Sequence, residues 1–183
     1  TWTLSDGTFL SSNSNTYTIS ESQTNPGDEI VCTASATDND GASIESSTSI
    51  VIENTNPSID SFAINPDTNV EANTTLELQV SFSDIDNQGL NPTYEWYSAQ
   101  GSLLSSSNLL PLNSTYTVGT TITGTFSVTD INGGVATQSD IVTILNTNPT
   151  ISSPANIIAT PNPTTTSILT CSAGVSDYND GSL

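Results

Sequence analysis

Alternation of apolar and polar residues with a period of two is the main pattern along this chain. From residue 76 to residue 83, leucine, valine and phenylalanine occupy every second position, and glutamate, glutamine and serine occupy the positions between. Residues 121–129 repeat the pattern with threonine and serine on the polar side. Successive side chains of a β-strand point to opposite faces, so both segments are predicted to be strands with one buried face. No useful stretch shows the 3.6-residue period of a helix.

Turn signals separate these predicted strands. Asn39-Asp40-Gly41, Asn65-Pro66 and Asn132-Gly133 are residue combinations that favour tight turns. Several short strands, each with one apolar face, predict an all-β protein built as a two-sheet β-sandwich.

A repeat of about 92 residues organises the chain. The tetrapeptide Asn-Thr-Asn-Pro at residues 54–57 recurs at residues 146–149, and the alignment extends without a gap from Gly27 and from Gly119. Such a period predicts tandem domains of one kind.

The register of the repeat predicts three segments. Residues 58–149 hold one complete repeat, residues 1–57 the C-terminal part of a repeat, and residues 150–183 the N-terminal part of the next. We expect residues 1–57 to be completed by residues 150–183 of an adjacent copy. The chain is then one two-repeat period of a longer array, cut within a domain.

The two cysteines, Cys32 and Cys171, lie outside the complete repeat, where Gly124 and Leu78 occupy their positions. Both cysteines are thus missing there together, as expected for a bonded pair. Trp2 falls between them once the end of one copy is joined to the start of the next, an order typical of an immunoglobulin-type core. This pattern favours a disulfide between adjacent copies, and an oxidising compartment, over two free buried thiols.

Core volume is also balanced between the two repeats. Small residues beside the cysteines correspond to large ones in the complete repeat, which conserves packing. The pairs are Ala34 with Phe126, Ala36 with Val128, and Ala173 with Val80. The expected core residues are Trp2, Trp96, Leu78 and Phe126.

Several segments resemble the tandem immunoglobulin-like and polycystic-kidney-disease-type (PKD) repeats of large microbial cell-surface proteins. They are residues 33–41, 54–57, 169–171 and 176–177, with residues 2–7 similar to a PKD turn and residues 126–130 to the last-but-one PKD strand. The resemblance implies immunoglobulin-like, PKD- or cadherin-like sandwiches that act as spacers in adhesins, stalks and fibres. Residues 99–101 lack the acidic turn residue of PKD repeats, which leaves the choice between the two types open.

Composition excludes several classes of function. The chain has no Lys, Arg or His against 19 acidic residues, a formal charge of −19. Such a charge repels nucleic acid and anionic membranes, and no apolar run approaches the about 20 residues of a membrane span. Without imidazole, lysine or arginine, a paired-carboxylate hydrolase is the one enzyme class left. Because the aspartates recur at turns of both repeats, we expect a scaffold and no enzyme.

No cofactor is expected, and the one candidate is Ca²⁺, for which the repeated carboxylates offer oxygen ligands at the junctions between domains. In the complete repeat the expected ligands are Asp84, Asp86, Asp130, Glu53 and Asp60, and in the split repeat they are Asp38, Asp40, Asp177 and Asp180. The competing interpretation is that these are ordinary turn residues. Two sequons, at Asn73 and Asn113, predict glycosylation on the surface.

The sequence therefore predicts a rigid, glycosylated spacer on the cell surface or outside the cell, whose partners are neighbouring copies of itself and glycans. One alternative is an adhesive or carbohydrate-binding module, which needs an exposed aromatic side chain. Another is a non-covalent filament in which residues 150–183 of one subunit complete the domain begun by residues 1–57 of the next.

Overall fold

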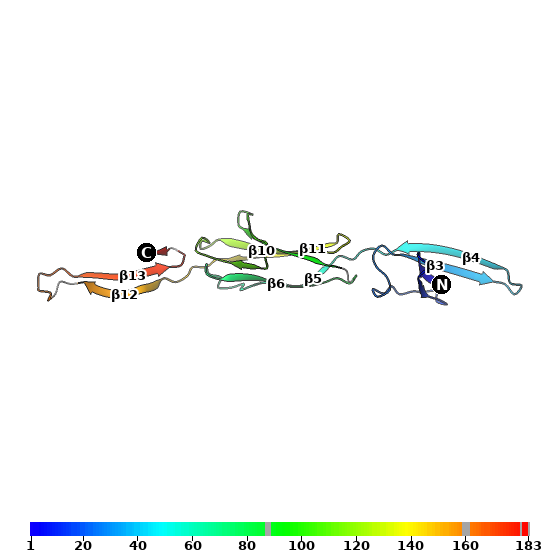
Figure 1. The fold of residues 1–183 in the computed structure, drawn as a ribbon, viewed down its shortest axis with the longest axis horizontal. Coiled ribbons are helices and arrows are strands. Elements are labelled where there is room, and N and C mark those ends of the chain that lie inside the picture. The colour runs from blue at the N-terminus through cyan, green and yellow to red at the C-terminus, as the bar shows by residue number, and fades with distance from the viewer. Residues whose placement is uncertain (87–88, 159–161, 180, 183) are drawn as a thin grey trace. The chain divides into compact units, whose positions relative to one another are not determined.

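The structure is a computed structural model that describes residues 1–86, 89–158, 162–179 and 181–182. Every regular element in these residues is a β-strand, which confirms the expected all-β class. The strands are β1 (Trp2–Leu4), β2 (Phe9–Ser11), β3 (Glu29–Thr37), β4 (Ser43–Val51), β5 (Ser58–Asn65), β6 (Thr75–Ser83), β7 (Asn91–Ser98), β8 (Leu103–Ser105), β9 (Leu109–Pro111), β10 (Thr121–Thr129), β11 (Val135–Thr143), β12 (Thr150–Ile158), β13 (Thr170–Asp177) and β14 (Gly181–Ser182) (Figure 1). Across the described part of the chain, no helix has the length and hydrophobicity needed to cross a membrane.

The strands form antiparallel sheets with the orders β2-β1-β3-β4, β11-β10-β7-β8, β12-β13-β14 and β5-β6-β9. By residue contacts the chain divides into two compact units. The first comprises Thr1–Asp60, Ser81–Pro92 and Ser127–Thr137, and the second comprises Ser61–Val80, Thr93–Phe126 and Gln138–Leu183. The expected repeat boundaries after residues 57 and 149 stay a prediction.

The second unit contains a hydrophobic core to which two sheets contribute. Strands β5, β6 and β9 supply Ile64, Leu76, Leu78 and Leu110, and strands β7, β10 and β11 supply Trp96, Ile122 and Val142. Burial alternates along β6 and β10 as the sequence pattern predicts. Two sheets that bury their apolar faces against each other are consistent with the expected β-sandwich.

Trp96 lies at the centre of this core and is fully buried. Its Nε1–H donates to the carbonyl of Ser107 at 3.0 Å, so burial leaves no polar atom of the indole unpaired. At one end of this core, the backbone N–H of Leu145 donates to the carbonyl of Val70 at 2.7 Å. A parallel bridge joins Glu71 and Leu145 at the same place.

The first unit contains the hairpin of β3 and β4, paired without interruption from Glu29 opposite Val51 to Thr37 opposite Ser43. Strand β1 pairs with the other edge of β3 and places Trp2 beside Cys32. The Trp2 ring is half-buried, stacks on Tyr17 at a centroid distance of 6.0 Å, and donates its Nε1–H to the carbonyl of Ser14.

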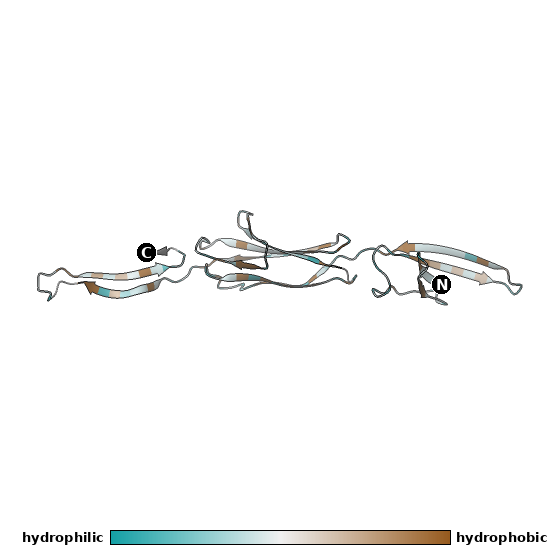
Figure 2. Ribbon diagram, in the orientation of Figure 1, coloured by the Kyte–Doolittle hydropathy of each residue, from teal (hydrophilic) through white to brown (hydrophobic). Residues whose placement is uncertain are grey.

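Strands β12 and β13 form a second hairpin, in the second unit, in which Ile157 lies opposite Cys171. Hydrophobic residues form bands along β4 and β12 in Figure 2. Every residue of β4 and of β12 is exposed, so the part of the chain that the structure describes leaves these bands uncovered.

Candidate functional site: the linkers and the turns that hold them

The two Asn-Thr-Asn-Pro segments, residues 54–57 (the first linker) and residues 146–149 (the second linker), each lead directly into a strand, β5 or β12. Both are held by side chains from the turn after the second strand that follows the linker, β6 for the first linker and β13 for the second. The same kind of contact occurs at both linkers.

The first linker is held by the turn after β6. Asp84 Oδ1 accepts the backbone N–H of Asp86 at 2.8 Å, a side-chain turn typical of aspartate. This turn directs the Asp86 carboxylate at the linker, where Oδ2 accepts the N–H of Thr55 at 2.7 Å. We call Thr55, Asp84 and Asp86 the first clasp.

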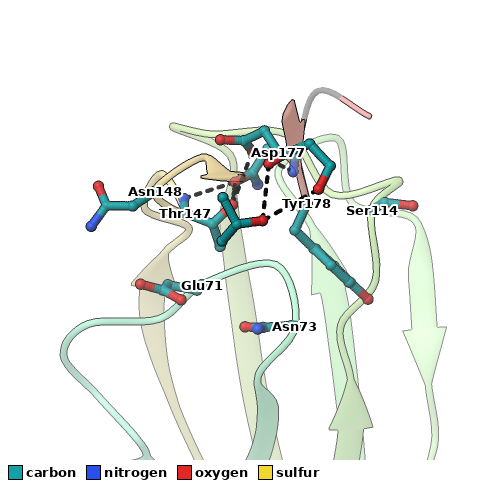
Figure 3. A pocket seen from close by; sticks show the side chains of 10 residues that line it. Glu71, Asn73, Ser114, Thr147, Asn148, Asp177 and Tyr178 are labelled. Atoms are coloured by element: carbon teal, nitrogen blue, oxygen red, sulfur yellow. Dashed lines mark hydrogen bonds between the residues drawn. The ribbon is translucent and has the colours of Figure 1, made fainter. Parts of the chain in front are cut away.

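The second linker is held in the same way by the turn after β13. Asp177 Oδ1 accepts the N–H of Asn179 at 2.8 Å, and Asn179 Oδ1 accepts the N–H of Thr147 at 2.8 Å. The Thr147 hydroxyl also donates to Asp177 Oδ1 at 3.1 Å and to Asn179 Oδ1. Thr147 and Asp177 are buried. Thr147, Asp177 and Asn179 form the second clasp, and the side chains of Thr147 and Asp177 point toward each other in Figure 3.

Asp130, in the turn between β10 and β11, holds the first linker from a second side. Its Oδ1 accepts the N–H groups of Asn132 and Gly134, each at 2.8 Å. Its Oδ2 accepts the side-chain N–H of Asn54 at 2.9 Å, while Asn132 donates its own amide to Asn54 Oδ1 at 3.0 Å. Asp130 is buried, and this Asp130 network satisfies it entirely with N–H donors.

The Asp130 network keeps its carboxylate ionised. The hydrogen bond from the Asn54 side chain is the largest cause that lowers the pKa of Asp130 below 3.8, with further help from the N–H groups of Gly134, Asn132 and Gly133, while burial opposes them. The network therefore stabilises the fold fully above pH 3.8, and this stabilisation is lost as the pH falls through the lower folded pKa.

We expect the melting temperature of the wild type to fall on acidification below pH 3.8 more steeply than that of Asp130→Asn, which cannot titrate at this position. Thermal unfolding followed by circular dichroism between pH 2 and pH 7 measures the difference. Parallel pH profiles for the two proteins would contradict the assignment.

Gly134 leaves the space that the network needs. A Cβ at this position would lie 2.3 Å from Asp130 Oδ2, 2.7 Å from Asn56 Oδ1 and 2.8 Å from Asn54 Nδ2. Gly134→Ala should therefore destabilise the protein by about 1–3 kcal/mol, the usual range for overpacking.

Gly89→Ala is the matched control, because no atom of the described residues lies within 4 Å of a Cβ there. Urea unfolding of both variants gives the comparison. Equal stability of Gly134→Ala and Gly89→Ala would show that the linker is not held by Asp130.

The hairpin of β3 and β4 has the same turn as the Asp130 network. Asp38 Oδ1 accepts the N–H groups of Asp40 at 3.0 Å and of Ala42 at 2.9 Å. Gly41 and Gly133 both have positive φ, of 86° and 92°, which glycine adopts without strain. The turn chemistry is thus shared by the two aligned segments, although alanine stands at position 42 and glycine at position 134.

The expected calcium ligands are arranged mainly as acceptors for N–H and O–H donors. Asp38, Asp86, Asp130 and Asp177 accept hydrogen bonds as described above, and Asp60 Oδ1 accepts the hydroxyls of Ser58 and Ser83. Glu53 and Asp40 are exposed, and Asp180 lies outside the described residues. Asp84 Oδ2 is buried and finds no hydrogen-bond partner among the residues that the structure describes.

Within residues 1–86, 89–158, 162–179 and 181–182, no three acidic or cysteine side chains come together as a set that can hold a metal ion. The Asp130 carboxylate, surrounded by amide donors, does not fit a cation. Calcium binding stays a prediction, and thermal unfolding in EDTA and in calcium chloride is the measurement that decides it.

An open hollow of about 940 Å³ lies beside the second clasp (Figure 3). It is lined by polar groups, among them Glu71, Asn73 and Ser114, and by the ring of Tyr178, which is 45% exposed. The lining offers hydrogen-bond donors and acceptors together with one aromatic face, a combination suited to a neutral polar ligand.

Both sequon asparagines are exposed and lie in turns. Beside Asn73, the Glu71 N–H donates to the hydroxyl of Thr74, and Asn113 Oδ1 accepts the N–H of Thr115 at 2.9 Å. Exposure permits attachment of a sugar at either site, and glycosylation stays a prediction. Cys32 is partly buried and Cys171 is exposed, and both are free thiols.

Sequence reasoning used the two tetrapeptides only as markers of the repeat and missed the roles of Asn54, Thr55 and Thr147. Their backbone and side-chain groups make the contacts that hold the linkers. The identical tetrapeptide at both positions was the available signal, because a plain connector would not require the same residues twice.

No protein-family model, curated protein sequence or solved structure matches this chain.

Proposed function

We propose that this chain is a structural repeat of an extracellular filament, stalk or adhesin, in which immunoglobulin-like or PKD-type sandwiches with a period of about 92 residues act as rigid, glycosylated spacers. The observation that carries the proposal is the repeated clasp. Thr55 donates to Asp86, and Thr147 donates to Asn179, by the same backbone group at equivalent places.

A spacer needs linkers that do not bend freely. A peptide connector without contacts rotates about its φ and ψ angles, whereas a linker N–H bound to the turn of the following domain loses that freedom. Proline at the end of each linker restricts it further, because its ring fixes φ. The clasps and the Asp130 network together supply the stiffness that a fibre requires.

The burial of Trp96 supports a spacer more than a carbohydrate-binding module. A sugar-binding surface generally uses an exposed aromatic ring, but this indole is fully buried and its N–H is already paired. Trp2 is half-buried and stacked on Tyr17. The chain also lacks His, Lys and Arg, so a catalytic role forms no part of the proposal.

A carbohydrate-binding or adhesive module is the second candidate function, and the hollow beside the second clasp is the observation that favours it. Tyr178 presents a half-exposed ring there, next to amide and hydroxyl groups. Binding to a glycan array that is lost in Tyr178→Ala would support this candidate over the spacer.

Location on the cell surface is tested with an antibody against this chain on intact source cells. Immunogold label on fibres or stalks outside the cell is the expected result. Label that appears only after the cells are permeabilised would refute an extracellular role.

Stiffness is tested at the first clasp. Asp86→Ala removes the acceptor of the Thr55 N–H and should cost about 0.5–1.5 kcal/mol of local stability, the net value of one hydrogen bond. Amide hydrogen exchange at Thr55 should rise correspondingly. Asp86→Asn is the matched control, because asparagine fills the same role in the second clasp at position 179.

We expect Asp86→Asn to keep the slow exchange of the wild type. If all three proteins exchange Thr55 at the same rate, the clasp does not restrict the linker, and the main support for a rigid spacer is lost.

A further inference from the structure

Two apolar side chains of the incomplete segments are exposed, although their counterparts in residues 58–149 are buried. Leu169, just before β13, is 55% exposed, whereas Leu76, at the equivalent place before Leu78, is 0% exposed. Ile50 on β4 is 67% exposed, whereas Val142 on β11 is 3% exposed. An apolar side chain that is buried in one repeat needs a cover in the other as well.

The complete repeat shows what provides that cover. Leu76 and Leu78 lie on β6, and Val142 lies on β11, in the opposite sheet of one core. The equivalents of these two strands are β13 and β4. By analogy with the complete repeat, the apolar face of β13 would be covered by the apolar face of a β3–β4 hairpin.

The two sheets lie close together at the positions that correspond to the cysteines. A Cβ on Gly124 would lie 2.8 Å from Leu78 Cδ2 and 2.9 Å from Trp96 Cζ3. Positions 78 and 124 thus face each other across the core, with the tryptophan beside them. Leu78 fills the space that the missing side chain of Gly124 leaves.

In the incomplete segments the same three positions are Cys171, Cys32 and Trp2. Cys32 and Trp2 are already neighbours, paired on adjacent strands β3 and β1. Cys171 lies on β13 with its side chain exposed. If β13 packs on β3 as β6 packs on β10 in the complete repeat, the Cys171 sulfur takes the place of the Leu78 side chain. The Cys32 sulfur then takes the place where Gly124 has no side chain.

We propose that Cys171 of one copy forms a disulfide bond with Cys32 of a second copy, across the core of a sandwich assembled from residues 150–183 of the first and residues 1–57 of the second. This inference rests on the proposed function, since it requires copies that join in series. Each joint between two copies is then linked by a disulfide bond, and reduction of this bond separates the copies.

The bond forms by thiol–disulfide exchange with a small disulfide such as oxidised glutathione. One cysteine thiolate attacks a sulfur of the oxidant, forms a mixed disulfide and releases one glutathione thiolate. The second cysteine then attacks the mixed disulfide and releases the second glutathione. The two cysteines lose two electrons and two protons, and the oxidant leaves as two molecules of reduced thiol.

The test uses Cys32→Ser and Cys171→Ser, each of which keeps one half of the proposed bond. The two variants are incubated separately and as an equimolar mixture with oxidised glutathione, at a salt concentration that screens the charge of −19. We expect a disulfide-bonded dimer in the mixture at several-fold higher yield than in either variant alone. The wild type should form a ladder of longer covalent chains on a non-reducing gel.

Peptide mapping identifies the bond. The chain has no trypsin site, so a glutamate-specific protease is used, which releases Cys32 within residues 30–45 and Cys171 within residues 96–183. A linked pair of these peptides from the dimer of the mixture supports the proposal. Equal dimer yields in all three samples, or a wild type that stays monomeric with its own two cysteines joined, would overturn it.

The variant with both serines separates this inference from the proposed function. Analytical ultracentrifugation of Cys32→Ser with Cys171→Ser reports association without any disulfide. If this protein associates in series but the mixture yields no cross-linked peptide, the disulfide is refuted and the spacer array stands. If neither the variants nor the wild type associates at any concentration, the joining of separate copies in series is refuted.

Discussion

Replacing Trp96 by alanine should lower the free energy of unfolding by about 3–5 kcal/mol, the largest effect expected from any single substitution in this chain. The indole is fully buried between the two sheets, and alanine would leave a cavity bordered by Leu78 and by the backbone of Gly124. The carbonyl of Ser107 would also lose the N–H that it accepts. Small domains are stable by about 5–15 kcal/mol, so this loss is a large part of the total.

Trp2→Ala is the matched control, since the Trp2 ring is only half-buried and its N–H donates to the carbonyl of Ser14 in the same manner. Urea unfolding followed by circular dichroism should show a clearly smaller loss for Trp2→Ala than for Trp96→Ala. Equal losses for the two variants would mean that the fully buried Trp96 contributes no more to the stability of the fold than the half-buried Trp2.

Introducing cysteine at both Leu78 and Gly124 should create a disulfide inside residues 58–149 and stabilise them by about 4 kcal/mol against the reduced form. The two positions face each other, and a Cβ on Gly124 would lie 2.8 Å from the end of the Leu78 side chain. Shortening leucine to cysteine removes the contact with Leu78, while the Trp96 ring, 2.9 Å from the new Cβ, must shift slightly in both the reduced and the oxidised form. The loop from residue 78 to residue 124 is long, so its closure restricts the unfolded chain strongly.

The double variant is compared with Gln79→Cys plus Gly124→Cys, in which the first cysteine starts from the exposed face of β6. Free-thiol titration and melting with and without dithiothreitol report bond formation and its effect. We expect loss of both thiols in Leu78→Cys plus Gly124→Cys and retention of both in the control. Two free thiols in each protein would remove the geometric basis for pairing Cys32 with Cys171.

Much of the fold could be predicted because the buried face of a strand is visible in the alternation of apolar and polar residues along it. The alternation at Leu76, Leu78, Val80 and Phe82 is a property of neighbouring residues, and β6 has this alternation in the structure. The same holds for the turns, because an aspartate that binds N–H groups two and four residues later needs nothing from the rest of the chain. Asp38 and Asp130 both do this.

The candidate site could be predicted only in part, because its contacts join residues distant in sequence. Asn54 and Asp130 are 76 residues apart, and no local pattern indicates that an amide from one will pair with a carboxylate from the other. Asp84, Asp86 and Asp130 were correctly expected in turns. Whether their oxygens bind a cation or N–H groups depends on which donors the folded chain brings near them. In the structure N–H groups donate to both oxygens of the Asp130 carboxylate.

The glycine that cradles Asp130 has a consequence for how an array of these repeats would bend. At the first linker, Gly134 makes room for the Asn54 amide. In the aligned hairpin alanine stands at position 42, and its methyl group would take up the corresponding space beside a linker. The amide of Asn146 in the second linker donates instead to the carbonyl of Thr147. A fibre built from such copies would have two kinds of joint in alternation, one held from two sides and one from a single side. Thermal bending would then concentrate at every second joint, and the fibre would behave as a chain of stiff two-domain rods.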